Sequence, residues 1–422
     1  MQAHALVDAN NFYATCEKIF QPGLEGVPLV VLSNNDGCIV SRSAEARALG
    51  LPMAAPIHQW QGFCEQHGVV IRSSNYTLYG DMSERMLMVL QGLCPVVESY
   101  SIDESFLDLT GLSDLTARAR DIRTRLRRGT HITCGVGIGP TRTLAKLANL
   151  IAKQQPGTDG VFSLFDCAQS EQDALMAALP VRAVWGVGSR LGRRLTAEGI
   201  SSVLDLKRAA SSGIRQRYGV VLEKTVRELN GQPCLDMEEV GRPRRQIVSS
   251  RSFATVLSDI EPLRAAVTHH VSHAAEKLRR QHGLAQHVYV MIRTNPNREQ
   301  DIQYSRTTLM PLVSPTADSA VILAAAMSGL RAIFRPGLRY HKVGVMLGEI
   351  SDAGVCQADL FAAADDSRRT RLMSLVDRIN QQQGRGTVRF ASEALDDAWH
   401  MRAAHRSPRY TTCWDELPVV QC

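Results

Sequence analysis

An acidic pair between two short alternating runs constrains this chain more than any other feature of its sequence. Residues 97–109 read VESYSIDESFLDL, and apolar and polar residues alternate on both sides of the centre. Such alternation is typical of half-buried strands, so we predict a hairpin whose tight connection spans residues 101–105. Asp103 and Glu104 lie in that connection. Adjacent carboxylates repel each other unless a cation holds them, so the pair is a candidate site for a hard metal ion. The alternative is an ordinary solvent-facing turn.

A third carboxylate follows a predicted strand near the N-terminus. The apolar run ALV at residues 5–7 leads into Asp8, and Phe12 and Tyr13 open a predicted helix. If this strand joins the hairpin in one sheet, three carboxylates meet at one edge. Three hard oxygen donors can hold two Mg²⁺ about 4 Å apart, and such a pair of ions clamps both oxygens of an in-line phosphoryl displacement.

Three motifs carry a resemblance to a known family. They read DANNFYATCE at residues 8–17, YSIDESFLDLTG at 100–111 and VGIGPTRTLAKLAN at 136–149. Together they resemble the Y-family translesion DNA polymerases, most closely the UmuC type, and the resemblance extends over the whole chain. It implies error-prone, template-directed DNA synthesis past damaged bases in the SOS response, with primer–template DNA and dNTPs as substrates. It also implies two Mg²⁺ at Asp8, Asp103, Glu104 and the backbone carbonyl of Ala9.

The resemblance further implies an α+β multidomain fold with the right-hand polymerase arrangement. The expected parts are a ferredoxin-like palm (1–20 and 75–165), small fingers (21–74), a helix-hairpin-helix thumb (166–235), a linker (236–249), a βαββαβ little finger (250–350) and a C-terminal extension (351–422). The residue pattern agrees in the last third of the chain. We predict strands at 250–257, 287–294, 304–309 and 340–347, and helices at 261–282 and 316–334, which is the order of a split β-α-β fold. The glycines of GVGIG, at 135–139, do not match a dinucleotide-binding loop, and we expect them to allow close approach of neighbouring segments.

Four residues are implied to contact the incoming nucleotide. Tyr13 would lie beneath its sugar, while Ser41, Arg47 and Lys153 would contact the triphosphate. A guanidinium suits this role because its fork of donors matches phosphate oxygens. The residue pattern alone favours an ordinary solvated helix face for Arg47. Phe12 and Tyr13 are likewise compatible with a core position. Many relatives carry Tyr where Ala44 stands, so one triphosphate contact is expected to be missing or replaced.

Two segments are expected to hold DNA. The run VWGVGSRLGRR resembles a helix-hairpin-helix, in which Gly186 and Gly188 leave backbone N–H groups free for a phosphate and Arg190 adds charge. A plain turn between helices is the alternative. The stretch from residue 241 to 350 carries 15 Lys and Arg against 7 Asp and Glu, while the whole chain has a net charge of only +6. This concentration of positive charge favours contact with a polyanion.

The C-terminal part contains a candidate partner motif. QADLF at 357–361 resembles the pentapeptide with which bacterial polymerases bind the sliding clamp, through Gln357, Leu360 and Phe361. The remaining tail resembles the UmuC C-terminus and is expected to dock partners. The family resemblance adds a cleaved UmuD-type dimer and RecA to the expected partners.

Composition excludes several other classes. Ten cysteines occur without a C-x-x-C pair, so neither a zinc site nor a disulfide framework is indicated. The N-terminus lacks a signal-peptide pattern and no apolar run has the length of a membrane span, so we expect a cytoplasmic protein without membrane contact. Two functional alternatives stay open on the residues alone: a palm-type nucleotidyl cyclase and a non-catalytic damaged-DNA-binding repair subunit.

Overall fold

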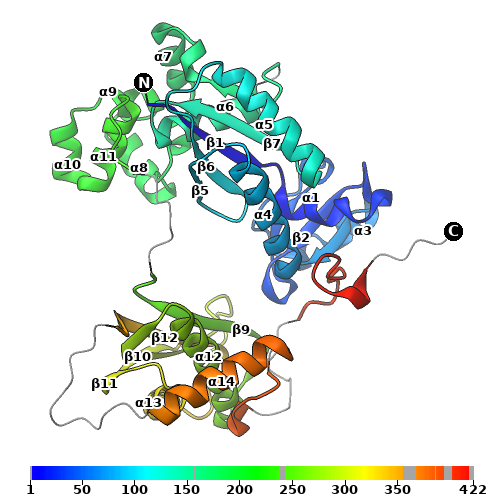
Figure 1. The fold of residues 1–422 in the computed structure, drawn as a ribbon, viewed down its shortest axis with the longest axis vertical. Helices are drawn as coiled ribbons and strands as arrows, with labels where there is room; N and C mark the ends of the chain where they lie inside the picture. The colour runs from blue at the N-terminus through cyan, green and yellow to red at the C-terminus, as the bar shows by residue number, and fades with distance from the viewer. Residues whose placement is uncertain are drawn as a thin grey trace. The chain divides into compact units, whose positions relative to one another are not determined.

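The computed structural model (Figure 1) describes residues 2–155, 157–236, 243–354, 367–384, 386–393 and 402–417. The chain divides into two compact units. The first comprises Met1–Ser33, Gly37–Gly241 and His405–Cys422, and the second comprises Asn34–Asp36 and Arg242–Ala404. Among the residues that are described, no helix is both long and apolar enough to cross a membrane.

The first unit is built on a five-stranded sheet with the order β5-β6-β1-β7-β8. Its strands are β1 (His4–Ala9), β5 (Val97–Ser99), β6 (Glu104–Asp108), β7 (Cys134–Gly139) and β8 (Val161–Ser163). The central strand β1 pairs antiparallel with both β6 and β7. Strands β5 and β6 form the predicted hairpin, which is confirmed. Its connection is residues 100–103 rather than 101–105, because Glu104 and Ser105 already pair within the sheet.

Helices cover both faces of this sheet (Figure 1). Helices α4 (Tyr76–Gln91) and α5 (Leu115–Thr130) share one core with Val7 and Val136. Helix α6 (Arg142–Gln154) lies on the other face, where its Ala145 is buried with Leu6 and Phe106. Successive residues of a strand point to opposite faces, so Asp8 shares the α6 face with Leu6, and Glu104 shares it with Phe106.

Three glycines of β7 bring α6 unusually close to the sheet. Gly135, Gly137 and Gly139 alternate with valine and isoleucine and therefore lie on one face of the strand. A Cβ at Gly137 would stand 1.9 Å from the backbone nitrogen of Asn149 and 2.4 Å from the carbonyl oxygen of Ala145. The expectation that these glycines allow close approach is thus confirmed, and Asn149 in turn donates to the carbonyl of Leu6 at 3.2 Å.

A smaller sheet and a helical part complete the first unit. The sheet has the order β3-β2-β4, with β2 (Leu29–Leu32), β3 (Ile39–Arg42) and β4 (Val70–Ser73). Helices α1 (Phe12–Ile19), α2 (Ala44–Ala48) and α3 (Gln61–Gln66) accompany it. The helical part consists of α7 (Gln169–Ala178), α8 (Ser189–Ala197), α9 (Val203–Arg208), α10 (Ser211–Tyr218) and α11 (Val220–Leu229), which share a core with Leu144 and Leu147 of α6.

The second unit has the predicted β-α-β-β-α-β order. It contains β9 (Ile247–Leu257), α12 (Ile260–Arg280), β10 (Gly283–Thr294), β11 (Ser305–Thr316), α13 (Ser319–Ile333) and β12 (Tyr340–Asp352), and its antiparallel sheet has the order β11-β10-β12-β9. The first strand begins at Ile247, three residues before the predicted start, because Ile247 already pairs with Leu347. Both helices pack on one face of the sheet, with Val267, Ile322 and Val345 in the common core.

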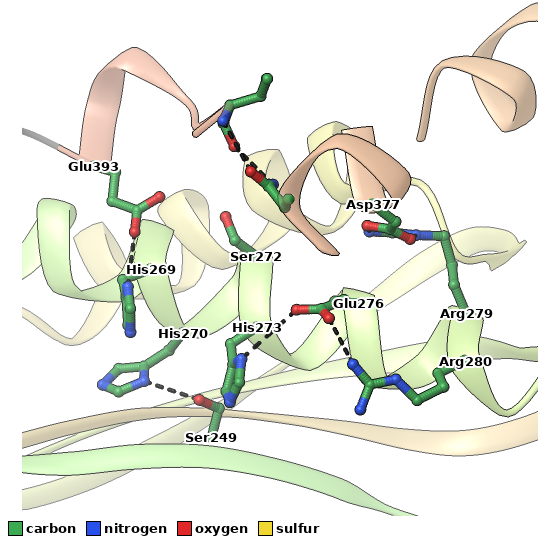
Figure 2. A network of polar contacts seen from close by, with 12 residues as sticks. Ser249, His269, His270, Ser272, His273, Glu276, Arg279, Arg280, Asp377 and Glu393 are labelled. Carbon is green, nitrogen blue, oxygen red and sulfur yellow. Dashed lines mark hydrogen bonds and ion pairs between the residues drawn. The ribbon is translucent and has the colours of Figure 1, made fainter. Parts of the chain in front are cut away.

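Residues beyond β12 pack against α12. Figure 2 shows Asp377 of α14 (Ser367–Gln382) and Glu393 of the 3₁₀ turn Ala391–Glu393 directed at this helix. The carboxylate of Asp377 accepts two hydrogen bonds from Arg279, at 2.6 and 2.7 Å, and Glu393 lies 2.7 Å from Nδ1 of His269. Beneath them, His270 is buried and lies 2.9 Å from the hydroxyl of Ser249, and burial lowers its pKa to about 3. The predicted extension 351–422 is therefore divided, because residues 405–417 belong to the first unit.

The packing of α6 on β7 predicts a strong effect of one methyl group. Gly137→Ala should lower the free energy of unfolding by at least about 2 kcal/mol, because the backbone of α6 must move away. Gly80→Ala is the matched control: Gly80 lies within α4, and no atom lies within 4 Å of the added Cβ. This control should gain about 0.5–1 kcal/mol through helix propensity. Urea unfolding of the three proteins measures both values, and equal stability of Gly137→Ala and the unsubstituted protein would contradict the close packing.

Candidate active site

Strand pairing brings the three predicted carboxylates to one end of the main sheet. Asp8 and Glu104 are direct partners across β1 and β6. The backbone N–H of Ala9 donates to the carbonyl oxygen of Asp103 at 2.9 Å, which closes the end of the same strand pair. The side chains of Asp8 and Glu104 are 19% and 16% exposed, so both are largely withdrawn from water without being sealed off.

Each carboxylate has one close partner. Lys153 Nζ lies 2.6 Å from Asp8 Oδ1, and Lys146 Nζ lies 2.9 Å from Glu104 Oε2. The two lysines are seven residues apart on α6, hence two turns apart on the same helix face. Asp103 Oδ1 accepts a hydrogen bond from the hydroxyl of Ser101 at 2.6 Å. The close approach of α6 to β7 is therefore what delivers positive charge to the acidic edge.

The electrostatics of Asp8 reflect this crowding. Burial raises its pKa above the ordinary aspartate value, and the charges of Glu104 and Asp103 act in the same direction. The ammonium group of Lys153 opposes them but does not reverse the net shift. The folded protein therefore holds Asp8 in a place where its ionised form is disfavoured, a common property of functional carboxylates.

The three carboxylates are suitable ligands for a divalent cation, but their side chains are not arranged around a common metal position in this structure. Within the described ranges, no group of three or more His, Cys, Asp or Glu side chains is arranged to hold a metal ion. Lys153, Lys146 and Ser101 each engage one of the three carboxylates. Hard oxygen donors with mutual repulsion are nevertheless the ligand type that Mg²⁺ prefers, so the residues present fit such an ion.

A cavity of about 440 Å³ opens beside Asp103. It brings together five of the predicted site residues: Ala9, Tyr13, Ser41, Arg47 and Asp103. The other wall residues are Asn11, Phe12, Val40, Arg42, Met53 and Ile102. Asp8, Glu104 and Lys153 are not part of the wall.

The polar wall of the cavity contains a residue that the sequence analysis missed. Arg42 lies at the end of β3, and its guanidinium donates to the carbonyl of Leu51. Its position next to Ser41 in SRSAEAR was the available signal. Ser41 is buried, and its hydroxyl accepts a hydrogen bond from the backbone N–H of Ala14 at 3.3 Å. Arg47 and Ala44 are exposed on α2, so the guanidinium of Arg47 is free to move toward a ligand.

The two adjacent aromatic residues occupy different environments. Both border the cavity, but Phe12 is buried in the core, whereas Tyr13 is only partly buried. The ring of Tyr13 stacks on Tyr79, with ring centroids 4.5 Å apart and an interplanar angle of 16°. It also meets the edge of Tyr76, at 6.0 Å and 87°. Such pairs add to burial energy and restrict the ring to one orientation.

The remaining predicted residues lie away from this cavity. Gly186 has a positive φ of 87°, Gly188 precedes the first residue of α8, and Arg190 is exposed on that helix. The segment directly before them is a 3₁₀ turn, Val181–Ala183, rather than an α-helix. The motif Gln357, Leu360 and Phe361 lies outside the described residues.

Solved structures identify the class of fold. A Y-family DNA polymerase chimera based on Dbh matches with a TM-score of 0.65 at 20% identity, over 83% of this chain and 99% of that one. An insertion ternary complex of Dbh DNA polymerase matches with a TM-score of 0.53 over the same shares. The fold is therefore that of a Y-family DNA polymerase, which uses a divalent metal.

Related sequences identify the family within this class of polymerases. The impB/mucB/samB family matches residues 7–149, its C-terminal domain matches 244–360, and a domain of unknown function (DUF4113) matches 370–420. Protein UmuC of Salmonella typhimurium is 44% identical over 99% of this chain and 100% of its own length. Protein MucB of Escherichia coli is 43% identical over 99% of each chain, and DNA polymerase IV of Moorella thermoacetica is 28% identical over 91% of this chain and 94% of its own.

This chain belongs to the impB/mucB/samB family, the UmuC type of Y-family DNA polymerase. Its activity is DNA-directed DNA synthesis of the error-prone, translesion kind that acts in SOS mutagenesis. This membership favours the polymerase over the nucleotidyl cyclase and the non-catalytic repair subunit, which the carboxylates alone leave open.

The environment of Asp8 predicts an unusual response to substitution. A raised pKa means that ionisation of Asp8 costs free energy on folding, a cost that appears as pH rises through the folded-state pKa. Asp8→Asn removes this cost, so the free energy of unfolding at pH 7 without metal should not fall. The difference from the unsubstituted protein should shrink at acidic pH, where Asp8 is protonated.

A second buried carboxylate supplies the control. Glu228 is 0% exposed and accepts four hydrogen bonds, from the N–H and hydroxyl of Thr143 and the N–H groups of Cys234 and Leu235. In Glu228→Gln an amide group would face these donors, so stability should fall by about 2–3 kcal/mol. Urea unfolding in the presence of a chelator compares the two variants. A loss in Asp8→Asn as large as in Glu228→Gln would mean that Asp8 is a structural residue.

Proposed function

We propose that this enzyme performs nucleotidyl transfer at the end of β1 and β6, with Asp8, Asp103 and Glu104 as its catalytic carboxylates. One observation supports the proposal above all others. The pairing of Asp8 with Glu104, together with the bond from Ala9 to Asp103, gathers three carboxylates at one strand end, next to a cavity of nucleotide size. It acts as a cytoplasmic enzyme on primer–template DNA and dNTPs.

The metal complement that we propose is two Mg²⁺. Asp8, Asp103, Glu104 and the backbone carbonyl of Ala9 would hold them. When bound, the ions would lower the pKa of the primer 3′-hydroxyl and neutralise charge on the phosphates. Lys146 and Lys153 balance the charge of two of these carboxylates in the metal-free chain. Once Asp8 has a metal partner, the ammonium group of Lys153 is available to the triphosphate.

The cavity is the proposed site of the incoming nucleotide. Tyr13 lies beneath the sugar, held by its stack on Tyr79. Arg47 reaches the triphosphate from the exposed face of α2. The hydroxyl of Ser41 already accepts from Ala14, so its own proton is free to be donated to a phosphate oxygen. Ala44 offers no hydroxyl, so a contact that many relatives make through Tyr is absent here.

The parts of the fold take the roles of a right-handed polymerase. We assign the palm to the five-stranded sheet with α4, α5 and α6, the fingers to the sheet of β2, β3 and β4, the thumb to α7–α11, and the little finger to the sheet of the second unit. The boundaries are those predicted from the sequence, with the little finger beginning at β9.

Two surfaces are proposed to hold the DNA backbone. In the thumb, Gly186, Gly188 and Arg190 lie at the exposed start of α8. In the second unit, Arg293 and Lys342 are cross-strand partners on the sheet face opposite α12 and α13, because their neighbours Ile292 and Val343 are buried under the helices. Adjacent cations on an open sheet face suit the phosphate backbone and carry no sequence information.

The proposed partners follow from the family. Gln357, Leu360 and Phe361 would bind the sliding clamp, with the two apolar side chains entering a pocket. A cleaved UmuD-type dimer and RecA are proposed as further partners of the C-terminal region.

The catalytic assignment predicts the loss of synthesis without the loss of folding. Asp103→Ala or Glu104→Ala should slow primer extension by on the order of 10³-fold or more, which corresponds to about 4 kcal/mol of barrier. Asp108→Asn, at the opposite end of β6, is the control and should extend primers at the normal rate. Primer extension with purified protein, Mg²⁺ and dNTPs measures the effect. More than about a tenth of normal extension in either alanine variant would refute the assignment.

The position of Tyr13 predicts a change in sugar selectivity. Tyr13→Ala should incorporate dNTPs at a near-normal rate and gain strongly in ribonucleotide incorporation, because the ring that overlaps a 2′-hydroxyl is gone. A buried residue of the same core gives the contrast: Met86→Ala, which lies outside the cavity wall, should lower stability and leave selectivity unchanged. The ratio of kcat/KM for dNTP over the matching rNTP is the readout. A folded Tyr13→Ala protein that still rejects ribonucleotides would remove Tyr13 from this role.

A further inference from the structure

The last described segment of the chain docks on the first unit. Residues 405–417 lie at the end of the region that matches the domain of unknown function, and Figure 1 shows them in red. The backbone N–H of His405 donates to the hydroxyl of Ser73 at 2.9 Å, and the N–H of Ser73 donates to the carbonyl of His405 at 3.1 Å, so the segment forms an isolated bridge to the end of β4. The hydroxyl of Tyr410 accepts from Gln21 at 2.6 Å, and its ring stacks on Phe20 at 5.0 Å. The docking is thus built from specific polar and aromatic contacts.

Asn75 joins this segment to the start of α4. Its side-chain oxygen caps the helix by accepting from the N–H of Leu78 at 3.4 Å. Its amide nitrogen lies within 3.1 Å of three oxygens of the segment: the carbonyl and hydroxyl of Ser407 and the carbonyl of Pro408. Asn75 is buried, so these acceptors replace water for its amide group. The C-terminal segment therefore fixes the residue that caps α4.

Glu17 forms a second connection, at the centre of the interface. This carboxylate is 0% exposed. Its Oε1 accepts from the hydroxyl of Ser407 at 3.0 Å and from the hydroxyl of Tyr79 at 2.6 Å, and Arg72 Nε lies 4.0 Å from its Oε2. Burying a carboxylate is costly unless donors satisfy it, and the segment supplies one of the two donors to Oε1.

Tyr79 connects this buried carboxylate to the nucleotide cavity. Its hydroxyl binds Glu17, and its ring stacks on Tyr13. Tyr13 and Glu17 are four residues apart on α1, so they lie on one face of that helix and Tyr79 spans both. Tyr76, in the first turn of the capped helix, meets the edge of the Tyr13 ring. The orientation of Tyr13 thus depends on groups that the C-terminal segment holds in place.

We propose that residues 405–417 are a positioning element for Tyr13, and that through Asn75 and the Glu17–Tyr79 pair they contribute to the exclusion of ribonucleotides. This role gives a function to the end of the domain of unknown function. It rests on the proposed function of Tyr13 at the sugar of the nucleotide. Ser407 and Tyr410 are positioning residues, since neither lines the cavity.

The test uses the full chain and compares sugar selectivity among variants. Ser407→Ala removes one donor to Glu17 and one acceptor for Asn75, and Ser407→Ala/Tyr410→Ala also removes the stack on Phe20. The ratio of kcat/KM for dNTP over rNTP should fall by on the order of tenfold in the double variant and less in Ser407→Ala. Trp414→Ala is the matched control, because Trp414 lies in the same segment and is 89% exposed, and it should leave the ratio unchanged.

Two comparisons separate positioning from general stabilisation. In a Tyr13→Ala background, Ser407→Ala/Tyr410→Ala should cause no further fall in the ratio, because residues that act through one another are not additive. Amide hydrogen exchange in the first turn of α4 should rise in the double variant and not in Trp414→Ala. An equal loss of dNTP and rNTP incorporation, with the ratio unchanged, would overturn the proposal while leaving Tyr13 in its role. An unchanged ratio in Tyr13→Ala itself would overturn both.

Discussion

The candidate active site depends on how closely helix α6 lies on strand β7. Three glycines on one face of β7 allow an approach that any side chain would prevent, as the 1.9 Å distance from a Cβ at Gly137 to Asn149 shows. Because the helix is so close, Lys146 and Lys153 reach Glu104 and Asp8 across the sheet. Without that contact, the β1–β6 pair would end in an uncompensated cluster of negative charge. Helix α6 therefore meets two requirements at once: it packs closely on β7, and its two lysines balance the charge of Asp8 and Glu104.

Three carboxylates of the first unit show how environment divides structural from functional groups. The carboxylates of Glu228 and Glu17 are fully buried and accept hydrogen bonds from Thr143 and Ser407, so they connect segments that are distant in the sequence. Burial raises the pKa of both Glu17 and Asp8, but Asp8 is partly exposed, and neighbouring carboxylates add to its shift. Because its ionised form is less favoured than in water, the carboxylate of Asp8 is suited to bind a divalent cation in place of Lys153. The same residue chemistry thus stabilises the fold at one place and supplies a proposed metal ligand at another.

Much of the fold was predictable because its signals are local. Alternation around Asp103 and Glu104 indicated the hairpin, and the residue pattern of 261–282 indicated helix α12. Element ends were predicted less well: β9 begins at Ile247 because a cross-strand pair extends it, and only a 3₁₀ turn directly precedes the glycines of the expected helix-hairpin-helix. The site was predictable where motifs resemble a known family, as at Asp8 and Tyr13. Arg42 was missed because its place in the cavity wall depends on the position of strand β3 beside α1.

The sequence by itself determined the chemistry available to this protein: three carboxylates next to predicted strand ends, a basic β-α-β-β-α-β part, and motifs that resemble one polymerase family. These features depend only on residue type and on spacing over a few residues, so they can be recognised from periodicity and motifs. Only the tertiary structure decided which groups meet. The bond from Ser407 to Glu17 joins residues 390 positions apart, and Tyr79 spans Glu17 and Tyr13 from another helix. Contacts of this kind arise from the packing of whole elements, so no local pattern in the chain could reveal them.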